Sequence, residues 1–220
     1  MAVITGIVSS TRKEGRFVLQ VDGAGGATVS LEIIDRLQLR VGLEVDEALA
    51  ARLEEEGAAL AAYDRALNML AFQARSSRDL KRRLVQKGEL ESNAESAVQR
   101  LVAAGLLDDA EYARQVARSK VSGQGASKRR LQQELFKRGV ERSVADDAIG
   151  EVMSEEGVDE GEVVERFARK KLRSLGALDA PTRRRRLYAY LARRGYDGEA
   201  IRRVMERVLG EGESEVEIEE

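Results

Sequence analysis

The sequence of 220 residues has no cysteine, no histidine, no tryptophan and a single proline, Pro181. The missing thiolates and imidazoles exclude cysteine- and histidine-based catalysis and the usual zinc and iron ligand sets. Without disulfides the fold depends on its core and its helix packing, which suits a reducing compartment. No apolar run approaches the roughly 20 residues of a membrane helix, and Met1–Ser10 lacks the features of a secretory signal. We therefore expect a cytoplasmic protein with no membrane partner and no cofactor.

A pattern of two leucines, a basic residue and a glycine occurs three times in the chain. It spans Leu80–Gly88, Leu131–Gly139 and Leu187–Gly195, and its glycines lie 51 and 56 residues apart. A period near 50 residues is typical of arrays of similar helical units. Such arrays present an extended surface rather than a chemical pocket. The pattern therefore favours a binding protein.

Apolar periodicity predicts a mainly α fold of three tandem three-helix repeats in an elongated, curved array, preceded by a small N-terminal antiparallel β-containing segment. The expected parts are residues 1–60 for this extension with its short helices, 61–106, 107–157 and 158–209 for the repeats, and 210–220 for a disordered acidic tail.

Local signals place the elements within these parts. We expect strands at Val3–Ser9, Arg16–Val21 and Ala27–Leu31, with the glycine-rich stretch 22–26 as the loop between the last two. Asp46 is expected to cap a helix that ends near Glu56, and a separate helix is expected at Ala62–Gln73. The other expected caps are Ser76 or Ser77, Ser92, Asp108 in a capping box with Glu111, Ser143, Asp179 followed by Pro181, and Asp197.

Two stretches have a possible chemical interpretation and a structural one. The glycines of residues 22–26 lack the lysine and hydroxyl residue of a phosphate-binding loop, so a hairpin connection is favoured. Asp108 and Asp109 resemble a metal or acid–base pair, but a helix cap explains them without a site. The aromatic residues expected in the core by spacing are Tyr63, Phe72, Tyr112, Phe136 and Phe167, whereas Tyr188 and Tyr190 lie beside a basic run.

The net charge of −2 hides a strong partition along the chain. Residues 75–138 hold 15 basic and 8 acidic side chains, and residues 162–209 hold 14 and 6. On a helical wheel, Arg78, Arg129 and Arg185 take the same place relative to the leucines of their repeats. A shared basic surface of this kind suits phosphates or an acidic protein groove. The candidate contact residues are Arg75, Arg78, Arg82, Lys128, Arg129, Arg130, Arg183, Arg184 and Arg185.

The order of these motifs resembles the RecX family, regulatory proteins of the RecA recombinase. The resemblance lies in Arg75–Gly88, Gly105–Ala113 and Leu131–Gly139, and it extends over roughly residues 60 to 209. It implies three tandem three-helix repeats and a non-enzymatic protein that binds RecA and the filament of RecA on single-stranded DNA. It also implies restraint of the ATPase, strand-exchange and coprotease activities of RecA, with direct DNA binding in some members. The acidic tail after Leu209 is outside the family pattern.

Three functions remain for comparison. The leading hypothesis is a monomeric modulator, mainly an inhibitor, of RecA. The second is a regulatory protein that binds DNA directly with helix-turn-helix-like units, although its arginine-rich helices favour phosphate contacts over base readout. A hydrolase or transferase is the third, and the sequence offers no recognisable constellation for one.

Overall fold

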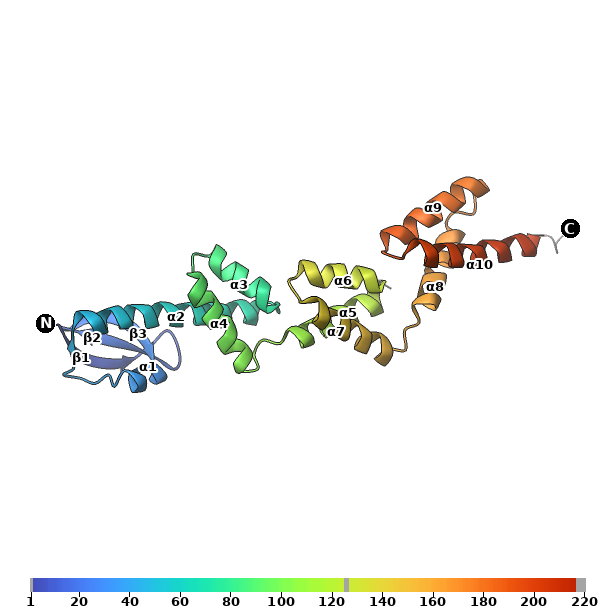
Figure 1. The fold of residues 1–220 in the computed structure, drawn as a ribbon. Coiled ribbons are helices and arrows are strands. Elements are labelled where there is room, and N and C mark those ends of the chain that lie inside the picture. The colour runs from blue at the N-terminus through green and yellow to red at the C-terminus, as the bar shows by residue number, and fades with distance from the viewer. Residues whose placement is uncertain (1, 125–126, 217–220) are drawn as a thin grey trace. The chain divides into compact units, whose positions relative to one another are not determined.

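The computed structural model describes residues 2–124 and 127–216. The chain divides into two compact units, Met1–Leu107 and Asp108–Glu220. The first unit contains a sheet and a three-helix domain, and the second contains two further three-helix domains. The mainly α fold with an N-terminal antiparallel sheet is therefore confirmed (Figure 1).

The N-terminal sheet has four antiparallel strands in the order β3-β2-β1-β4. The strands are β1 (Ala2–Ser9), β2 (Arg16–Val21), β3 (Ala24–Ser30) and β4 (Glu44–Val45), and the short helix α1 (Leu31–Arg36) follows β3. The prediction of a loop over residues 22–26 was wrong, because the hairpin turns within Asp22 and Gly23, with φ of 51° and 79°. A two-residue turn with two positive φ values matches the twist of an antiparallel pair, so β3 begins at once.

Helix α2 (Glu47–Phe72) joins the sheet to the first three-helix domain. The two separate helices expected here were therefore a wrong prediction, although Asp46 does cap the helix by accepting from Leu49 N–H at 2.7 Å. Glycine inside a helix costs about 1 kcal/mol, whereas burying one leucine contributes about 1.5–3 kcal/mol. Leu53 and Leu60, on either side of Gly57, are both buried against the sheet, which outweighs the glycine.

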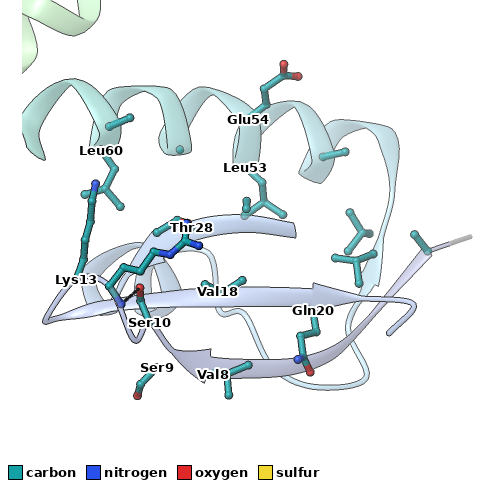
Figure 2. A pocket seen from close by; sticks show the side chains of 18 of the residues that line it. Val8, Ser9, Ser10, Lys13, Val18, Gln20, Thr28, Leu53, Glu54 and Leu60 are labelled. Atoms are coloured by element: carbon teal, nitrogen blue, oxygen red, sulfur yellow. Dashed lines mark hydrogen bonds between the residues drawn. The ribbon is translucent and has the colours of Figure 1, made fainter. Parts of the chain in front are cut away.

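The same helix supplies two different cores. Its first half packs on Ile4, Leu19 and Val29 of the sheet, and its second half contributes Ala62 and Ala66 to the core of the first three-helix domain. An open groove of about 1240 Å³ is lined by α2 and by residues of β1, β2 and β3. Figure 2 shows labelled side chains of this groove, with Leu53 and Leu60 on α2 and Val8, Val18 and Thr28 on the strands.

An ion-pair cluster fixes the first hairpin to α2. The Asp64 carboxylate accepts hydrogen bonds from Lys13 at 2.7 Å and from Arg16 at 2.6 Å. Burial raises the pKa of Asp64, but the hydrogen bonds from Arg16 and Lys13 outweigh it and leave this pKa below its ordinary value. The buried carboxylate therefore stays ionised and ties the sheet to the helix.

Three helices form each later domain, with one separate core per domain. The first domain adds α3 (Ser77–Gln86) and α4 (Glu91–Ala103) to the end of α2, and the second consists of α5 (Asp109–Gln124), α6 (Lys128–Lys137) and α7 (Arg142–Glu155). The third consists of α8 (Glu160–Arg173), α9 (Ala180–Arg193) and α10 (Gly198–Val216). Helix α10 continues to Val216, into the segment expected to be disordered, and residues 217–220 lie outside the described part.

The repeated leucine–glycine pattern ends the middle helix of each domain as expected. All six of its leucines are buried, with exposed fractions of 1% or less. Gly88, Gly139 and Gly195 have φ of 93°, 84° and 90°, the left-handed conformation that glycine adopts without strain at a helix end. The pattern therefore marks three equivalent structural positions.

Several predicted helix starts are correct. Ser76 caps α3, Asp179 caps α9, and Asp197 accepts from Ala200 N–H at 2.8 Å at the start of α10. Asp108 also caps its helix, because it accepts from Glu111 N–H at 3.0 Å. The carboxylate of Glu111 pairs with Arg114 instead of closing a capping box.

Two other predicted caps were wrong. Helices α4 and α7 begin one residue before Ser92 and Ser143, and their N-cap residues, Leu90 and Glu141, make no side-chain cap hydrogen bond. Both helices instead follow a short link after a glycine-ended helix, so the packing of α4 and α7 on their neighbours determines where they start.

Candidate partner-binding surface

The three equivalent arginines Arg78, Arg129 and Arg185 are exposed in the structure. Arg78 is the second residue of α3, and Arg129 is the second residue of α6. Within residues 2–124 and 127–216, none of the three makes an ion pair or a side-chain hydrogen bond. Their guanidinium groups are therefore free to bind a partner with negative charge.

The third middle helix differs from the other two in length. Helices α3 and α6 have 10 residues, whereas α9 has 14 and begins at its Asp179 cap, eight residues before Leu187. Arg185 therefore lies in the second turn of α9, one turn further from the helix start than Arg78 and Arg129. The three arginines therefore take the same position relative to the leucines in all three domains. Relative to the N-terminus of the middle helix, only Arg78 and Arg129 take the same position.

Asp79 engages three arginines around α3. Its carboxylate accepts from Arg75 at 2.9 Å and from Arg83 at 2.8 Å, and it also pairs with Arg82. Burial raises the pKa of Asp79, but the hydrogen bonds from these arginines, Arg83 first, leave it below the ordinary value. The side chain of Arg75 is only 11% exposed. Arg75 and Arg82 are thus partly engaged inside the domain, unlike Arg78.

The basic start of α6 lies against the third domain. The hydroxyl of Ser127, the N-cap of α6, is buried; it accepts from Arg130 N–H at 3.2 Å and donates to the Arg194 carbonyl at 3.1 Å. The guanidinium of Arg130 donates to the Arg193 carbonyl at 2.8 Å. The backbone N–H of Lys128 donates to Glu160 at 3.1 Å. Arg130 is therefore used within the unit, whereas the side chain of Lys128 is exposed.

In the third domain the basic run is divided between the interior and the surface. Arg183 is half-buried, and its Nε has no hydrogen-bond partner within the described chain. Arg184 and Arg185 are exposed. Of the nine predicted contact residues, five have exposed side chains with no ion pair or side-chain hydrogen bond inside the described parts: Arg78, Lys128, Arg129, Arg184 and Arg185. Arg82 and Arg130 are also exposed, but they are bound to Asp79 and to the Arg193 carbonyl.

The aromatic side chains expected in the core follow the spacing argument only in part. Tyr63, Tyr112 and Phe167 are partly buried against the cores of the three helical domains. Phe72 and Phe136, both expected in the core, are 89% and 69% exposed. Phe136 follows Leu135 directly and so lies 100° away from it on the helix, outside the arc that faces the core. The exposure of these rings was not predicted from the sequence, because the spacing rule does not show where the buried face of a helix ends.

Neither metal ligation nor membrane insertion is indicated by the described residues. In the parts of the chain that the structure describes, no group of three or more aspartate and glutamate side chains is placed to hold a metal ion. No helix within these same parts is long and apolar enough to cross a bilayer.

The fold and the repeats define the chain as a tandem three-helix-repeat protein with an N-terminal sheet. Family models of the three RecX three-helix domains match this chain. The first domain matches residues 62–101, the second matches residues 108–149 and the third matches residues 159–205. The chain belongs to the RecX family of regulatory proteins.

Relatives and solved structures agree with this assignment. Regulatory protein RecX of Amycolatopsis mediterranei (strain U-32) is 40% identical over 129 residues, which cover 59% of this chain and 72% of the relative. Regulatory protein RecX of Levilactobacillus brevis is 30% identical, with coverage of 93% and 76%. A crystal structure of regulatory protein RecX shares the fold, with a TM-score of 0.79 at 23% identity, covering 96% of this chain and all of the other.

Proposed function

We propose that this protein is a non-enzymatic modulator, mainly an inhibitor, of the RecA recombinase in the cytoplasm, where it binds RecA and its filament on single-stranded DNA. It restrains ATP hydrolysis, strand exchange and coprotease activity by occupying the filament, and it acts as a monomer. Membership of a family of regulatory proteins named RecX supports this assignment.

One observation about the residues supports the proposal most directly. Each three-helix domain exposes an arginine at the same place relative to its buried leucines, and Arg78, Arg129 and Arg185 have no ion-pair partner among the described residues. Exposed cations of this kind interact with phosphates or carboxylates of a large assembly. Many modest contacts spread over three domains suit a repetitive polymer better than a compact ligand.

The test is the ATPase of RecA on single-stranded DNA, measured with the wild-type protein and with a variant that combines Arg78→Glu, Arg129→Glu and Arg185→Glu. We expect the triple variant to lose most of its restraint of ATP hydrolysis while its far-ultraviolet circular dichroism is unchanged. The matched control combines Arg40→Glu, Arg52→Glu and Arg173→Glu, which are exposed arginines outside the set. The control changes the net charge equally and should restrain RecA as the wild type does.

Two results would contradict the proposal. Undiminished restraint by the triple variant would show that these arginines do not contact the filament. Equal loss in both variants would show that only the net charge matters. A protein that leaves RecA ATP hydrolysis untouched in its wild-type form is not the modulator proposed here.

A further inference from the structure

Phe72 is the most exposed large apolar side chain in the described part of the protein. It is the last residue of α2, and 89% of its surface is open to solvent. Burying a phenylalanine contributes about 1.5–3 kcal/mol, so the fold gains almost nothing from this ring. An exposed aromatic residue beside charged groups is a feature of binding surfaces.

The ring lines a surface hollow of about 540 Å³. Met69 lies one turn earlier on α2 and adds apolar surface to the hollow. The remaining wall comes from α2 and from the residues that flank and end α3. No acidic side chain is among the residues that line it. The cations in its wall are Arg65, Arg75, Arg83 and Lys87.

Two carboxylates pair with three of these four cations. Glu89 pairs with Arg65 at 2.7 Å, and Asp79 pairs with Arg83 at 2.8 Å. Both carboxylates are only 12% exposed, whereas the arginine side chains are close to half exposed. The shortest contact in each pair is made by Nε, and both guanidinium groups keep enough exposed surface to reach a ligand. The hollow therefore presents positive charge, although three of its four cations are paired.

Other aromatic rings beside arginines in this protein are already covered. Arg100 lies 4.5 Å from the centre of the Tyr63 ring, and Arg194 lies 4.1 Å from that of Phe167. No such cation covers Phe72 in the described residues. The face of the Phe72 ring is thus available to a flat ligand.

We propose that Phe72 is a stacking platform for an unpaired nucleobase of single-stranded nucleic acid, and that Arg65, Arg83 and Lys87 bind the phosphates on either side of that base. Every base has a face that stacks on an aromatic ring, and a groove of cations follows the backbone. In a duplex the bases are paired and stacked on each other, so no base face is accessible for stacking on the Phe72 ring.

The charges around the ring favour a nucleotide over a protein side chain. An apolar side chain docked on Phe72 would remove the half-exposed Arg65 and Arg83 and the exposed Lys87 from water without bringing an anion to them, and removing charges from water is costly. A nucleotide brings its own anionic phosphates, which form charge-assisted hydrogen bonds with guanidinium groups. This site is separate from the three equivalent arginines and requires no RecA.

The experiment measures binding of the full-length protein to a fluorescently labelled oligothymidylate by anisotropy, without RecA, at several salt concentrations. Stacking of one base predicts that Phe72→Ala weakens binding about 5- to 150-fold, with the dependence on salt unchanged. Phe72→Trp should bind as the wild type does. Lys87→Ala should instead reduce the slope of log affinity against log salt by about 0.7.

Phe136→Ala is the matched control, because Phe136 is also exposed but its hollow holds one arginine and one aspartate, Arg142 and Asp146. This variant should bind the oligonucleotide normally. Phe72→Ala should also leave unchanged the affinity for duplex DNA and for an oligonucleotide of abasic sites. Since the Phe72 ring is exposed, its removal should not alter thermal unfolding.

Three outcomes would overturn the inference. These are no measurable binding of the oligonucleotide by the wild type at low salt, wild-type affinity of Phe72→Ala, or the same loss on the abasic strand. If Phe72→Ala weakens only binding to RecA, the ring contacts protein, and the inference fails while the proposed function stands.

Discussion

Gly88 and Gly195 end the same pattern in two domains, and alanine substitution at the two positions should have very different effects. Both residues have φ near 90°. A Cβ added to Gly88 would meet nothing within 4 Å, whereas at Gly195 it would lie 2.7 Å from the hydroxyl of Ser127 and 3.0 Å from Cβ of Arg130. The first substitution therefore adds backbone strain only. The second also disturbs the contact between the second and third domains.

The magnitudes follow from these contacts. The left-handed conformation costs an alanine about 1–2 kcal/mol, and this cost is common to both variants. At Gly195 the added methyl displaces the Ser127 hydroxyl, which is the N-cap of α6 and is fully buried. Loss of a cap costs about 1 kcal/mol, and a buried hydrogen bond such as that to the Arg194 carbonyl contributes about 1 kcal/mol. Gly195→Ala should therefore destabilise the start of α6 by about 2 kcal/mol.

Hydrogen–deuterium exchange of the full chain, followed peptide by peptide, tests this difference. A loss of about 2 kcal/mol raises the opening equilibrium of α6 roughly 30-fold. We expect faster exchange in α6 with Gly195→Ala, and no change in α6 with Gly88→Ala, which should affect only α3 and its neighbours. If α6 exchanges at the same rate in both variants, Ser127 and Gly195 do not form the contact on which this reasoning rests.

Two further predictions concern ionisable groups inside the domains. Asp64→Asn leaves Arg16 without its carboxylate partner and should destabilise the packing of the sheet on α2 by about 2 kcal/mol. Because the pKa of Asp64 is lowered, the wild type should lose this contribution of the ion pair to stability as the pH falls below 3.8. Burial raises the pKa of Tyr196 to about 12, so the folded protein keeps this proton when the unfolded chain loses it. Stability should therefore fall by roughly 2 kcal/mol between pH 10 and 12, and this fall should be absent in Tyr196→Phe, as measured by urea unfolding.

The controls for these two predictions use the same measurements. Lys13→Ala removes only the half-exposed partner of Asp64 and should cost less than Asp64→Asn; an equal cost would show that burial of the carboxylate is unimportant. Identical pH profiles of the wild type and Tyr196→Phe above pH 10 would contradict the assignment of the alkaline loss to Tyr196.

The sequence predicted some of the strands and helix boundaries of the first unit correctly and others wrongly. Alternation located β1 and β2 correctly, but the helix that begins after Asp46 was predicted to end near Glu56, whereas α2 runs through Gly57 to Phe72. A local propensity of about 1 kcal/mol is outweighed when both neighbouring turns are buried against a sheet. The Asp22–Gly23 turn was misplaced for a different reason, since a wider glycine-rich stretch concealed a two-residue hairpin that the sequence does contain.

For the candidate binding residues, too, a local pattern predicted the helix face correctly but not the tertiary contacts of each side chain. The wheel correctly identified Arg78, Arg129 and Arg185 as facing away from the leucines, and the structure leaves them exposed. It did not distinguish them from Arg75, which is largely buried beside Asp79. The pairing of Arg75 depends on the position of another charged side chain, which periodicity does not specify.

Local sequence is sufficient to specify the three-helix domains and the ends of their middle helices, because a leucine stripe and a left-handed glycine act within a few residues of chain. The continuity of α2, the exposure of Phe72 and the contact of Ser127 with the turn at Gly195 arise only in the folded protein. Each of these depends on what distant segments bury or leave open, and no local pattern carries that information.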